Sequence, residues 1–281
     1  MKFQAVDKVS NISGKEFHEC YVKPGKPVIF EDLAKDWPAS DLWSFEYFRS
    51  RYGHWMIPMY DKSYHEPGAG YMKPATYKRF GEYLDIIEHE PTDLRFHNFQ
   101  IMKEAPELAE HYHTPRIMNG FLKFALMFFG GKDSTLNLHY DIDCSHVFLT
   151  HFQTRKKLYL FSPDQSELLY HLPFTNHSHL DVLQPDMEEF PAYEKARGMV
   201  ADIRHGETLF IPKLWWHFVH YVEGGFSLAL RANDSVATKA RGLWNLVRLF
   251  TVDTGMNYLA GESWKKYKEN QAKRNASRLL V

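Results

Sequence analysis

Cysteine and net charge are both scarce in this sequence. The chain of 281 residues contains two cysteines, Cys20 and Cys144, which are too few for a disulfide framework. Lysine and arginine number 34 and aspartate and glutamate number 35, so the formal net charge is -1. This neutral balance argues against a polybasic membrane anchor and against a protein that coats nucleic acid, although it does not exclude one local basic groove.

Long apolar runs are also absent. No run approaches the ~18 apolar residues of a membrane-spanning helix. The residues from Met1 to Asp7 have a lysine but no apolar stretch behind it, so they do not resemble a secretory signal peptide. With so few cysteines, we expect a reducing, cytoplasmic setting and no contact with a membrane.

The residues that are present indicate a folded protein rich in aromatic side chains and histidine. Hydrophobic residues make up 44% of the chain, charged residues 25% and aromatic residues 16%, and there are 16 histidines. This balance is typical of a globular protein and not of a disordered one. The aromatic content suits a large β-rich core, and the histidines favour a metal site. The length predicts one large domain or at most two small ones.

The first third of the chain mixes helical patterns with a short strand. Ser13-Gly14-Lys15-Glu16 fits a capping box and predicts the start of a helix. Residues 43–52 and 77–89 have apolar side chains at helical spacing and are predicted to be amphipathic helices. Residues 26–30 are predicted to form a strand, and residues 60–76, which are rich in proline and glycine, a surface loop.

The middle of the chain is predicted to form a series of short strands separated by turn residues. Apolar or alternating segments recur at regular spacing, with glycine pairs and Ser-Pro-Asp between them. Such a series indicates a β-sandwich or a β-barrel. The predicted strands cover residues 123–129, 136–140, 146–152, 157–161, 208–212 and 226–230.

Residues 235–281 are predicted to be helical again. Leu243, Leu246, Val247 and Phe250 recur at helical spacing and form an apolar stripe. This stripe either packs on the core of its own chain or joins two copies of the chain into a homodimer. We predict a single domain over the whole chain, made of a helix-rich part (1–120), a β core (121–235) and C-terminal helices (236–281).

His139-Tyr140-Asp141 is the first candidate for chemistry. On a strand, residues i and i+2 project to the same face, so His139 and Asp141 project together. A histidine and a carboxylate in this arrangement bind one face of a divalent metal if another segment supplies a third ligand. Two histidines and one carboxylate form the facial triad of non-haem Fe(II) oxygenases. The alternative is a histidine and an aspartate on the surface of an edge strand.

His217 is the candidate for the third ligand. It follows a predicted strand that ends at Pro212, and it comes directly after Trp215-Trp216. His220 is a rival ligand, because a helix would align it with His217, whereas a strand would not. The alternative is that the two tryptophans are core residues and His217 is their polar neighbour.

Two cations close to predicted strands could bind an anion. Lys156 precedes the apolar segment 158–161, and Arg231 ends the strand at 226–230. A lysine that points into a barrel must face an anion, because burying it unpaired costs several kcal/mol. A bound dicarboxylate would be such an anion, and an arginine can hold a carboxylate through two hydrogen bonds. The alternatives are a basic turn for Lys156 and a solvated strand end for Arg231.

Five sequence blocks occur in a fixed order in the second half of the chain. They are His139-Tyr140-Asp141; Lys156 to Gln165; Leu169-Tyr170; Pro185-Asp186 with Phe190-Pro191; and Gly206 to Pro212 with Trp215-Trp216-His217. Together they resemble the JmjC, or cupin-like, oxygenases that depend on Fe(II) and 2-oxoglutarate. The branch that is most similar contains the asparaginyl hydroxylase that acts on the hypoxia-inducible factor and the tRNA wybutosine hydroxylase. The N-terminal Lys26 to Phe30 and Trp37-Pro38-Ala39 also fit that branch.

The resemblance implies a fold, two cofactors and a set of site residues. The implied fold is mainly β, a double-stranded β-helix (jelly-roll or cupin) core with flanking helices. The implied iron ligands are His139, Asp141 and His217. Lys156 matches the lysine that pairs with the far carboxylate of 2-oxoglutarate. The resemblance thus predicts Fe(II) and 2-oxoglutarate as cofactors and O2 as a reactant.

The sequence departs from the family pattern around the cosubstrate. A serine or threonine is common three positions before the first histidine, where this chain has Leu136, and a tyrosine of an early strand corresponds to Phe96. An asparagine on the last strand of the asparaginyl hydroxylase corresponds to Arg231. We therefore expect Arg231 to join Lys156 in binding 2-oxoglutarate. Asp143, a second carboxylate near the triad, is expected to support the ligands or the structure.

The predicted activity is the hydroxylation of a protein or peptide side chain, with release of succinate and CO2. One alternative is a hydroxylase of a modified tRNA base or of a small metabolite; the neutral charge weakly disfavours nucleic acid. Another alternative is a non-catalytic cupin that binds a metal or a sugar as a sensor. Histone demethylation ranks low, because no cysteine cluster or reader domain accompanies the core.

Two expectations concern the surroundings of the site. We expect the loops at 60–76 and 171–190 to choose the substrate, through residues such as His65, Tyr71, His177 and His179. We also expect an apolar lining that excludes water, formed by Leu138, Phe148, Phe210 and Trp216.

Overall fold

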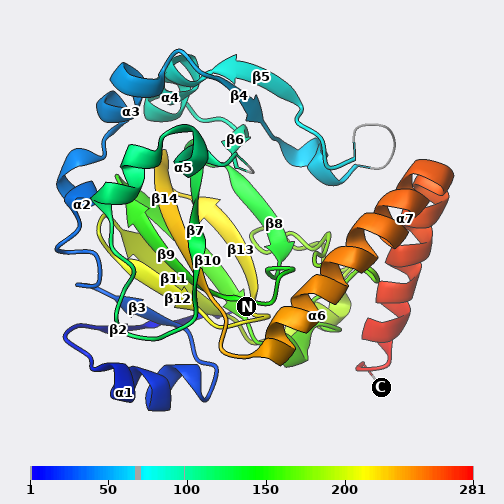
Figure 1. The fold of residues 1–281 in the computed structure, drawn as a ribbon. Helices are drawn as coiled ribbons and strands as arrows, with labels where there is room; N and C mark the ends of the chain where they lie inside the picture. Colours follow the sequence, from blue (N-terminus) through cyan, green and yellow to red (C-terminus); the bar gives the residue numbers. More distant parts are fainter. Residues whose placement is uncertain (1, 67–70, 98, 281) are drawn as a thin grey trace.

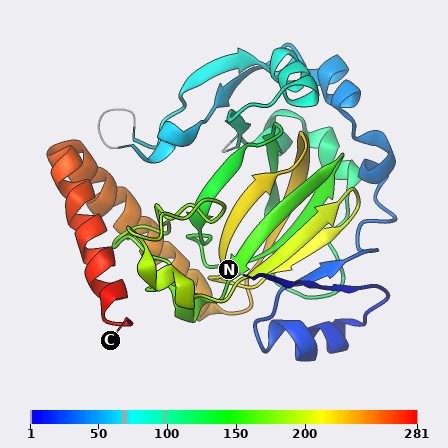
Figure 2. The same ribbon diagram turned by 180° about the vertical axis from the view of Figure 1, so that it is seen from behind.

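Two mixed β-sheets form the centre of the protein (Figures 1 and 2). The computed structural model describes residues 2–66, 71–97 and 99–280. The larger sheet has the strand order β2-β3-β12-β9-β14-β7-β6, and the smaller sheet has the order β1-β11-β10-β13-β8. From β7 to β14 the chain crosses repeatedly between the two sheets. This crossing is the jelly-roll arrangement and confirms the predicted double-stranded β-helix.

The strands agree closely with the prediction in the middle of the chain. The larger sheet consists of β2 (Asp7–Val9), β3 (Val28–Phe30), β6 (Arg95–Phe96), β7 (Phe121–Gly130), β9 (His146–Phe152), β12 (Thr208–Ile211) and β14 (Gly225–Ala232). The smaller sheet consists of β1 (Gln4–Ala5), β8 (Thr135–His139), β10 (Arg155–Phe161), β11 (Met199–Arg204) and β13 (Trp216–Tyr221). The sequence interpretation missed β11 and β13, and also the short strands β1, β2 and β6. The apolar residues of β11 and β13 are broken by charged or histidine side chains, which hid the strand pattern.

Apolar side chains from both sheets pack between them. Val147 and Leu209 of the larger sheet belong to the same buried cluster as Leu158, Ile203 and Val219 of the smaller sheet. All seven residues of β9 are buried, because this strand lies in the middle of its sheet and is covered on both faces. A strand buried on both faces lacks the strict alternation of apolar and polar residues that marks a half-exposed strand.

The N-terminal part wraps the outer face of the larger sheet. Ser13 caps α1 (Gly14–Phe17) by accepting a hydrogen bond from the backbone N–H of Glu16 at 3.2 Å, which confirms the predicted helix start. A π-helical turn, η1 (His18–Val22), continues this helix. Phe17 is fully buried, with its ring edge-on to that of Phe210 at 4.9 Å between centroids.

Short helices complete this layer. They are α2 (Pro38–Leu42), α3 (Phe45–Tyr52), α4 (Phe80–His89) and α5 (Ile101–Glu104), with the 3-10 turns η2 (Lys62–His65) and η3 (Pro106–His111). Two further 3-10 turns, η4 (Pro163–Gln165) and η5 (Pro191–Lys195), lie outside this layer, in the segment between β10 and β11. Phe48 of α3 and Phe80 of α4 both pack edge-on against Phe129 of β7, at 5.4 and 5.1 Å. These aromatic contacts bind the helices to the sheet.

One predicted helix begins later than the sequence suggests. Residues 77–79, assigned above to an amphipathic helix, belong to β5 (Thr76–Arg79), which pairs with β4 (Met56–Met59) in a separate hairpin. The helix starts only at Phe80. Tertiary pairing with β4 overrides the local helical pattern in this segment.

The C-terminal helices stand beside the sheets, as a pair that turns back on itself (Figure 1). The chain runs through α6 (Val236–Val247), a π-helical segment η6 (Arg248–Asp253) and α7 (Thr254–Ser277). Gly261 interrupts α7 with φ of 44°, a left-handed conformation that favours glycine, and the chain reverses there. No helix in the described residues is long and apolar enough to cross a membrane.

A buried polar cluster holds the C-terminal helices in place. Asp253 is fully buried and accepts hydrogen bonds from Lys268 at 2.6 Å and from the Trp264 indole N–H at 2.8 Å. Tyr71 also donates to Asp253, which ties the segment after β4 to these helices. The predicted apolar stripe lies elsewhere and is mostly exposed, with Leu243 65% and Phe250 59% accessible.

Candidate metal and cosubstrate site

Two histidines from neighbouring strands lie side by side. His139 ends β8 and His217 lies in β13; the two are direct partners across the antiparallel pair, and their ring centroids are 4.1 Å apart. His217 follows β12, as the sequence interpretation had it, but it also lies within β13, a strand that this interpretation missed. The rival His220 is three positions further along this strand, where its Nε2 lies 3.7 Å from Asp133. Alternation along the strand explains why it does not join the pair.

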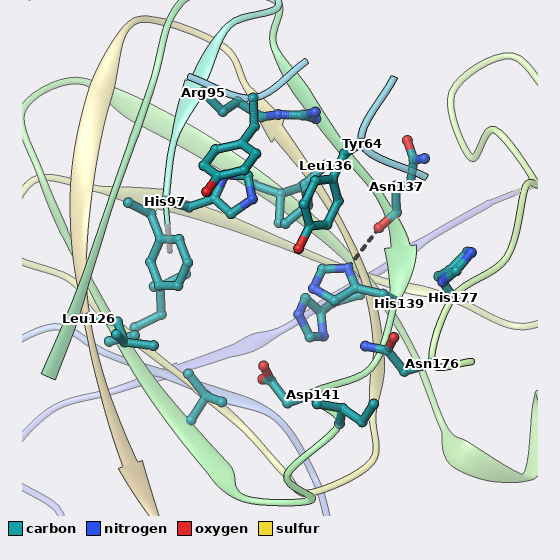
Figure 3. A pocket seen from close by; sticks show the side chains of 18 of the residues that line it. Tyr64, Arg95, His97, Leu126, Leu136, Asn137, His139, Asp141, Asn176 and His177 are labelled. Atoms are coloured by element: carbon teal, nitrogen blue, oxygen red, sulfur yellow. Dashed lines mark hydrogen bonds between the residues drawn. The ribbon is translucent and has the colours of Figure 1, made fainter. Parts of the chain in front are cut away.

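Backbone carbonyls orient both imidazoles. Nδ1 of His139 lies 2.7 Å from the carbonyl oxygen of Asn137 (Figure 3). Nδ1 of His217 lies 3.1 Å from the carbonyl oxygen of Trp215. A carbonyl only accepts hydrogen bonds, so each ring carries its proton on Nδ1 and its lone pair on Nε2. This is the arrangement by which protein structures prepare Nε2 of a histidine to ligate a metal.

Asp141 enters the same pocket but is held by an arginine. Its Oδ1 lies 2.6 Å from Nη2 of Arg231, whose Nη1 lies 2.7 Å from Oδ1 of Asp143. Burial opposes ionisation of Asp141, but the charge of Arg231 and the nearby His217 outweigh it, so the pKa of Asp141 lies below its usual value. Asp143 also accepts from the Ser145 hydroxyl at 3.0 Å, which keeps this small charge network in place.

The side chains as they stand do not yet enclose a metal. Among residues 2–66, 71–97 and 99–280, no three His, Cys, Asp or Glu side chains form a group that could hold an ion. The pair of imidazoles is in place, and the carboxylate of Asp141 faces Arg231. The donor types nevertheless suit a non-haem Fe(II) centre, because two imidazoles and one carboxylate leave positions open for other ligands.

Lys156 of β10 is a buried cation at the other end of the pocket. Only 1% of the residue is accessible. Its Nζ donates to the Ser227 hydroxyl at 2.6 Å and lies 4.0 Å from the centroid of the Tyr221 ring. Burial lowers the pKa of Lys156 well below its ordinary value. No carboxylate of the described chain forms an ion pair with it, so an anionic ligand in the cavity would supply the counter-charge that stabilises its charged form.

A histidine stands behind this lysine. Ser227 contacts both Lys156 and His151, whose Nδ1 lies 3.0 Å from the serine oxygen. His151 is fully buried, and burial and the charge of Lys156 keep its pKa well below its ordinary value. The Ser227 oxygen can accept from Lys156 while its hydroxyl donates to Nδ1 of a neutral His151.

One cavity of about 560 Å³ brings together the candidate metal ligands and the candidate anion-binding cations. It is lined by His139, Asp141, His217, Lys156 and Arg231, the five site residues singled out in the sequence. In Figure 3, His139 and Asp141 reach into this pocket together, with Arg95 at its opposite end.

The apolar lining differs from the expected one. Leu138, Phe148, Phe210 and Trp216 are buried in clusters away from the cavity, whose apolar wall is formed by Leu136, Leu149, Leu158, Ile211 and Val219. Strand alternation is the reason. Leu138 and Trp216 each neighbour a cavity-facing histidine, so they project to the other face of the sheet.

Parts of both predicted substrate loops reach the cavity. Tyr60, Tyr64 and Met72 line it from the first loop, and Asn176 and His177 from the second. Two other expected residues serve the structure. Tyr71 donates to Asp253, and His179 pairs with Glu269 at 3.1 Å. The side chain of His65 lies outside the described part of the chain.

Several residues in or beside the cavity were not anticipated from sequence. Ser227 and His151, which lie behind Lys156, had a signal, since each is a polar residue on a strand whose neighbours are mostly apolar. Tyr221 belongs to the missed strand β13. Arg95 had no signal, because it lies in a two-residue strand that only pairing with β7 defines.

Comparison with known proteins agrees with this geometry. A family model described as a cupin-like domain matches residues 14–233. Lysine-specific demethylase 8 of Xenopus tropicalis is 27% identical over 247 residues, which cover 80% of this chain and 52% of the relative. The HSPB1-associated protein 1 homolog of Danio rerio is 30% identical over 233 residues, or 70% of this chain and 49% of the relative.

A third relative carries an RNA-related name. tRNA wybutosine-synthesizing protein 5 of Danio rerio is 33% identical over 129 residues, which cover 46% of this chain and 36% of the relative. The chain thus spans about half the length, or less, of the curated relatives it matches.

Proposed function

The chain belongs to the cupin-like domain family, and from this premise we propose that it is an oxygenase dependent on Fe(II) and 2-oxoglutarate. Its reaction is the hydroxylation of a protein or peptide side chain with release of succinate and CO2. The observation that carries the proposal is the shared cavity. The imidazoles of His139 and His217 and a carboxylate lie at one end of it. Lys156, which is buried and has no carboxylate partner in the described chain, lies at the other end.

His139, His217 and Asp141 would hold the iron. Each histidine would bind through Nε2, since its Nδ1 is hydrogen-bonded to a carbonyl. Asp141 would bind through the oxygen that Arg231 leaves available. The bound iron, with 2-oxoglutarate and O2, would supply the oxidation of a C–H bond. The protein groups orient the ligands and keep water away through the apolar wall.

Lys156 would bind the far carboxylate of 2-oxoglutarate. A charge-assisted hydrogen bond in a buried site is worth about 1.5–3 kcal/mol. Ser227 and the ring of Tyr221 hold Nζ in position, so the lysine needs little reorganisation on binding. Contact between Arg231 and the cosubstrate stays a prediction. We assign Arg231 first to Asp141 and Asp143, because both of its terminal nitrogens are bonded there.

The net charge and the relatives favour the hypothesis of a protein or peptide substrate. Its net charge is -1, which gives no general attraction for nucleic acid. Two of the relatives above are named for demethylase or protein-associated roles. The relative named for tRNA wybutosine synthesis keeps a modified tRNA base as the alternative. We keep the prediction of a cytoplasmic location, which rests on the low cysteine content.

We also propose that two copies of the chain join through the C-terminal helices. Leu243, Val247 and Phe250 are exposed on α6 and η6, and an exposed apolar stripe of this kind favours association. Phe250 also lines the cavity, so a second copy at this surface would border the site.

The test is turnover by the purified, iron-loaded protein. We expect 2-oxoglutarate to be converted to succinate in the presence of O2, slowly without a substrate and faster with one. Peptide pools and total tRNA are then compared for the gain of one oxygen atom by mass spectrometry. Oxygen gain in tRNA alone would overturn the choice of a protein substrate, and the absence of any succinate would overturn the oxygenase itself.

A further inference from the structure

Three cations line the cavity, and they differ in what balances their charge. Arg231 faces Asp141 and Asp143 at 2.6 and 2.7 Å. Lys156 and Arg95 form no ion pair with a carboxylate within 4.0 Å among the described residues. A buried charge without a counter-charge is costly, so both cations call for an anion that the protein itself does not provide.

Arg95 is anchored by neutral groups only. It lies in β6, is 6% accessible, and donates through Nη2 to the carbonyl oxygen of Asp61 at 2.6 Å and through Nη1 to that of Thr135. Its Nε has no partner in the described structure. The two carbonyls fix the plane of the guanidinium but leave its charge unmatched.

The acidic side chains close to Arg95 are engaged elsewhere or too distant. Asp61 and Asp93 influence the pKa of Arg95, but burial outweighs them and lowers that pKa. The carboxylate of Asp61 caps η2 by accepting from the backbone N–H of Ser63 at 2.8 Å. Neither carboxylate therefore serves as the partner of the guanidinium.

Tyr221 connects Arg95 to Lys156. Lys156 and Tyr221 are direct partners across β10 and β13, and Nζ lies 4.0 Å from the tyrosine ring. On the other side, Arg95 pairs with Gly130 of β7. A Cβ at Gly130 would lie 2.6 Å from the Tyr221 ring, so glycine is what lets the ring pack against this strand. Arg95, Tyr221 and Lys156 thus line one stretch of the cavity wall, and Gly130 packs against the Tyr221 ring.

We propose that Arg95 and Lys156 together bind the far carboxylate of 2-oxoglutarate, one on each side of the Tyr221 ring. This inference rests on the proposed function. In Figure 3, Arg95 lies at the opposite end of the pocket from Asp141, with His139 between them, which is the arrangement that a bridging dicarboxylate requires. Leu136 and Phe96 line the same cavity without a polar group to offer, so a second cation takes up the carboxylate oxygen that Lys156 leaves.

Binding to the Mn(II)-loaded protein tests this assignment without turnover. Two ligands are compared by calorimetry: 2-oxoglutarate, and 2-oxopentanoate, which has the same chain length but ends in a methyl group. We expect Arg95→Gln to weaken 2-oxoglutarate binding about 10- to 100-fold, the range for loss of a charge-assisted hydrogen bond, and to change 2-oxopentanoate binding less than about threefold. Arg95→Lys, which keeps a positive charge, should fall between the parent and Arg95→Gln.

Arg155→Gln is the matched control. Arg155 precedes Lys156 on β10, faces away from the cavity and pairs with Asp202, so its loss should leave both affinities unchanged. Equal weakening of both ligands by Arg95→Gln would mean that Arg95 only supports the fold, and no weakening of either would mean that Lys156 acts alone; both results would overturn the inference. A parental protein that binds no 2-oxoglutarate would instead overturn the proposed function itself.

Discussion

The two ends of the cavity are built on opposite principles. At the His139 end, each polar group already has a protein partner: both imidazoles face carbonyls, and Asp141 faces Arg231. At the Lys156 end, a cation is held by a hydroxyl and an aromatic ring, and no carboxylate of the described chain balances it.

This contrast indicates how each end works. Groups that orient a ligand need neighbours that fix them, and the bonds at the His139 end do this before any ion arrives. A group that binds a charged molecule must keep its own charge unmatched until that molecule comes. The predictions that follow test this division, beginning with the largest expected effect.

Removal of a histidine at the orienting end should abolish activity. We expect His139→Ala to reduce succinate formation to background, because two donors cannot hold the ion with the required geometry. The matched control is His220→Ala on β13, which faces away from the pair and should keep parental activity. Parental succinate formation by iron-loaded His139→Ala would contradict the ligand assignment.

Replacing Lys156, the cation at the binding end, should weaken the binding of 2-oxoglutarate and change other properties of the protein little. Lys156→Ala should raise the 2-oxoglutarate concentration needed for half-maximal turnover about 10- to 100-fold. Lys157→Ala, one residue further on the other face of β10, serves as the control and should change nothing. An unchanged requirement in Lys156→Ala would move the carboxylate contact to Arg95, the other cation of the cavity that has no carboxylate partner among the described residues.

Breaking the charge network around Asp141 should destabilise the metal-free protein. Arg231→Gln leaves Asp141 and Asp143 without their cation, at a cost of about 3–5 kcal/mol for a buried charge left unpaired. A divalent metal restores positive charge to this spot, so Mn(II) should raise the melting temperature of the variant more than that of the parent. Thermal denaturation with and without Mn(II) measures both effects; an equal or smaller gain in the variant would show that Asp141 takes no part in binding the ion.

The smallest effect on the site itself is expected from the C-terminal stripe. Leu243→Ser combined with Val247→Ser should convert a dimer into a monomer in sedimentation at low micromolar concentration, while each chain stays folded. Phe124→Ser, a change at an equally exposed residue of β7, is the control and should leave the dimer intact. A parental chain that sediments as a monomer would refute the dimer.

Local patterns were enough for the central strands but not for the edges of the fold. The predicted strand at 146–152 matches β9 residue for residue, because a short, mostly apolar segment rich in β-branched and aromatic residues favours a buried strand. The helical spacing at 77–79 was overridden by pairing with β4. The expected lining by Leu138 and Trp216 was wrong, because a shift of one residue along a strand reverses the face.

The sequence by itself determined which residues could bind a metal and an anion, since His139, Asp141, His217, Lys156 and Arg231 stand in motifs whose side-chain types and order are visible along the chain. Only the tertiary structure decided what each of them faces. Arg231 pairs with two carboxylates. Arg95 lines the cavity without a carboxylate partner among the described residues, and no local sequence pattern predicts this role. The reason is physical: a side chain's type is fixed by its codon, but its counter-charge comes from strands that are distant in sequence and meet only in the folded sheet.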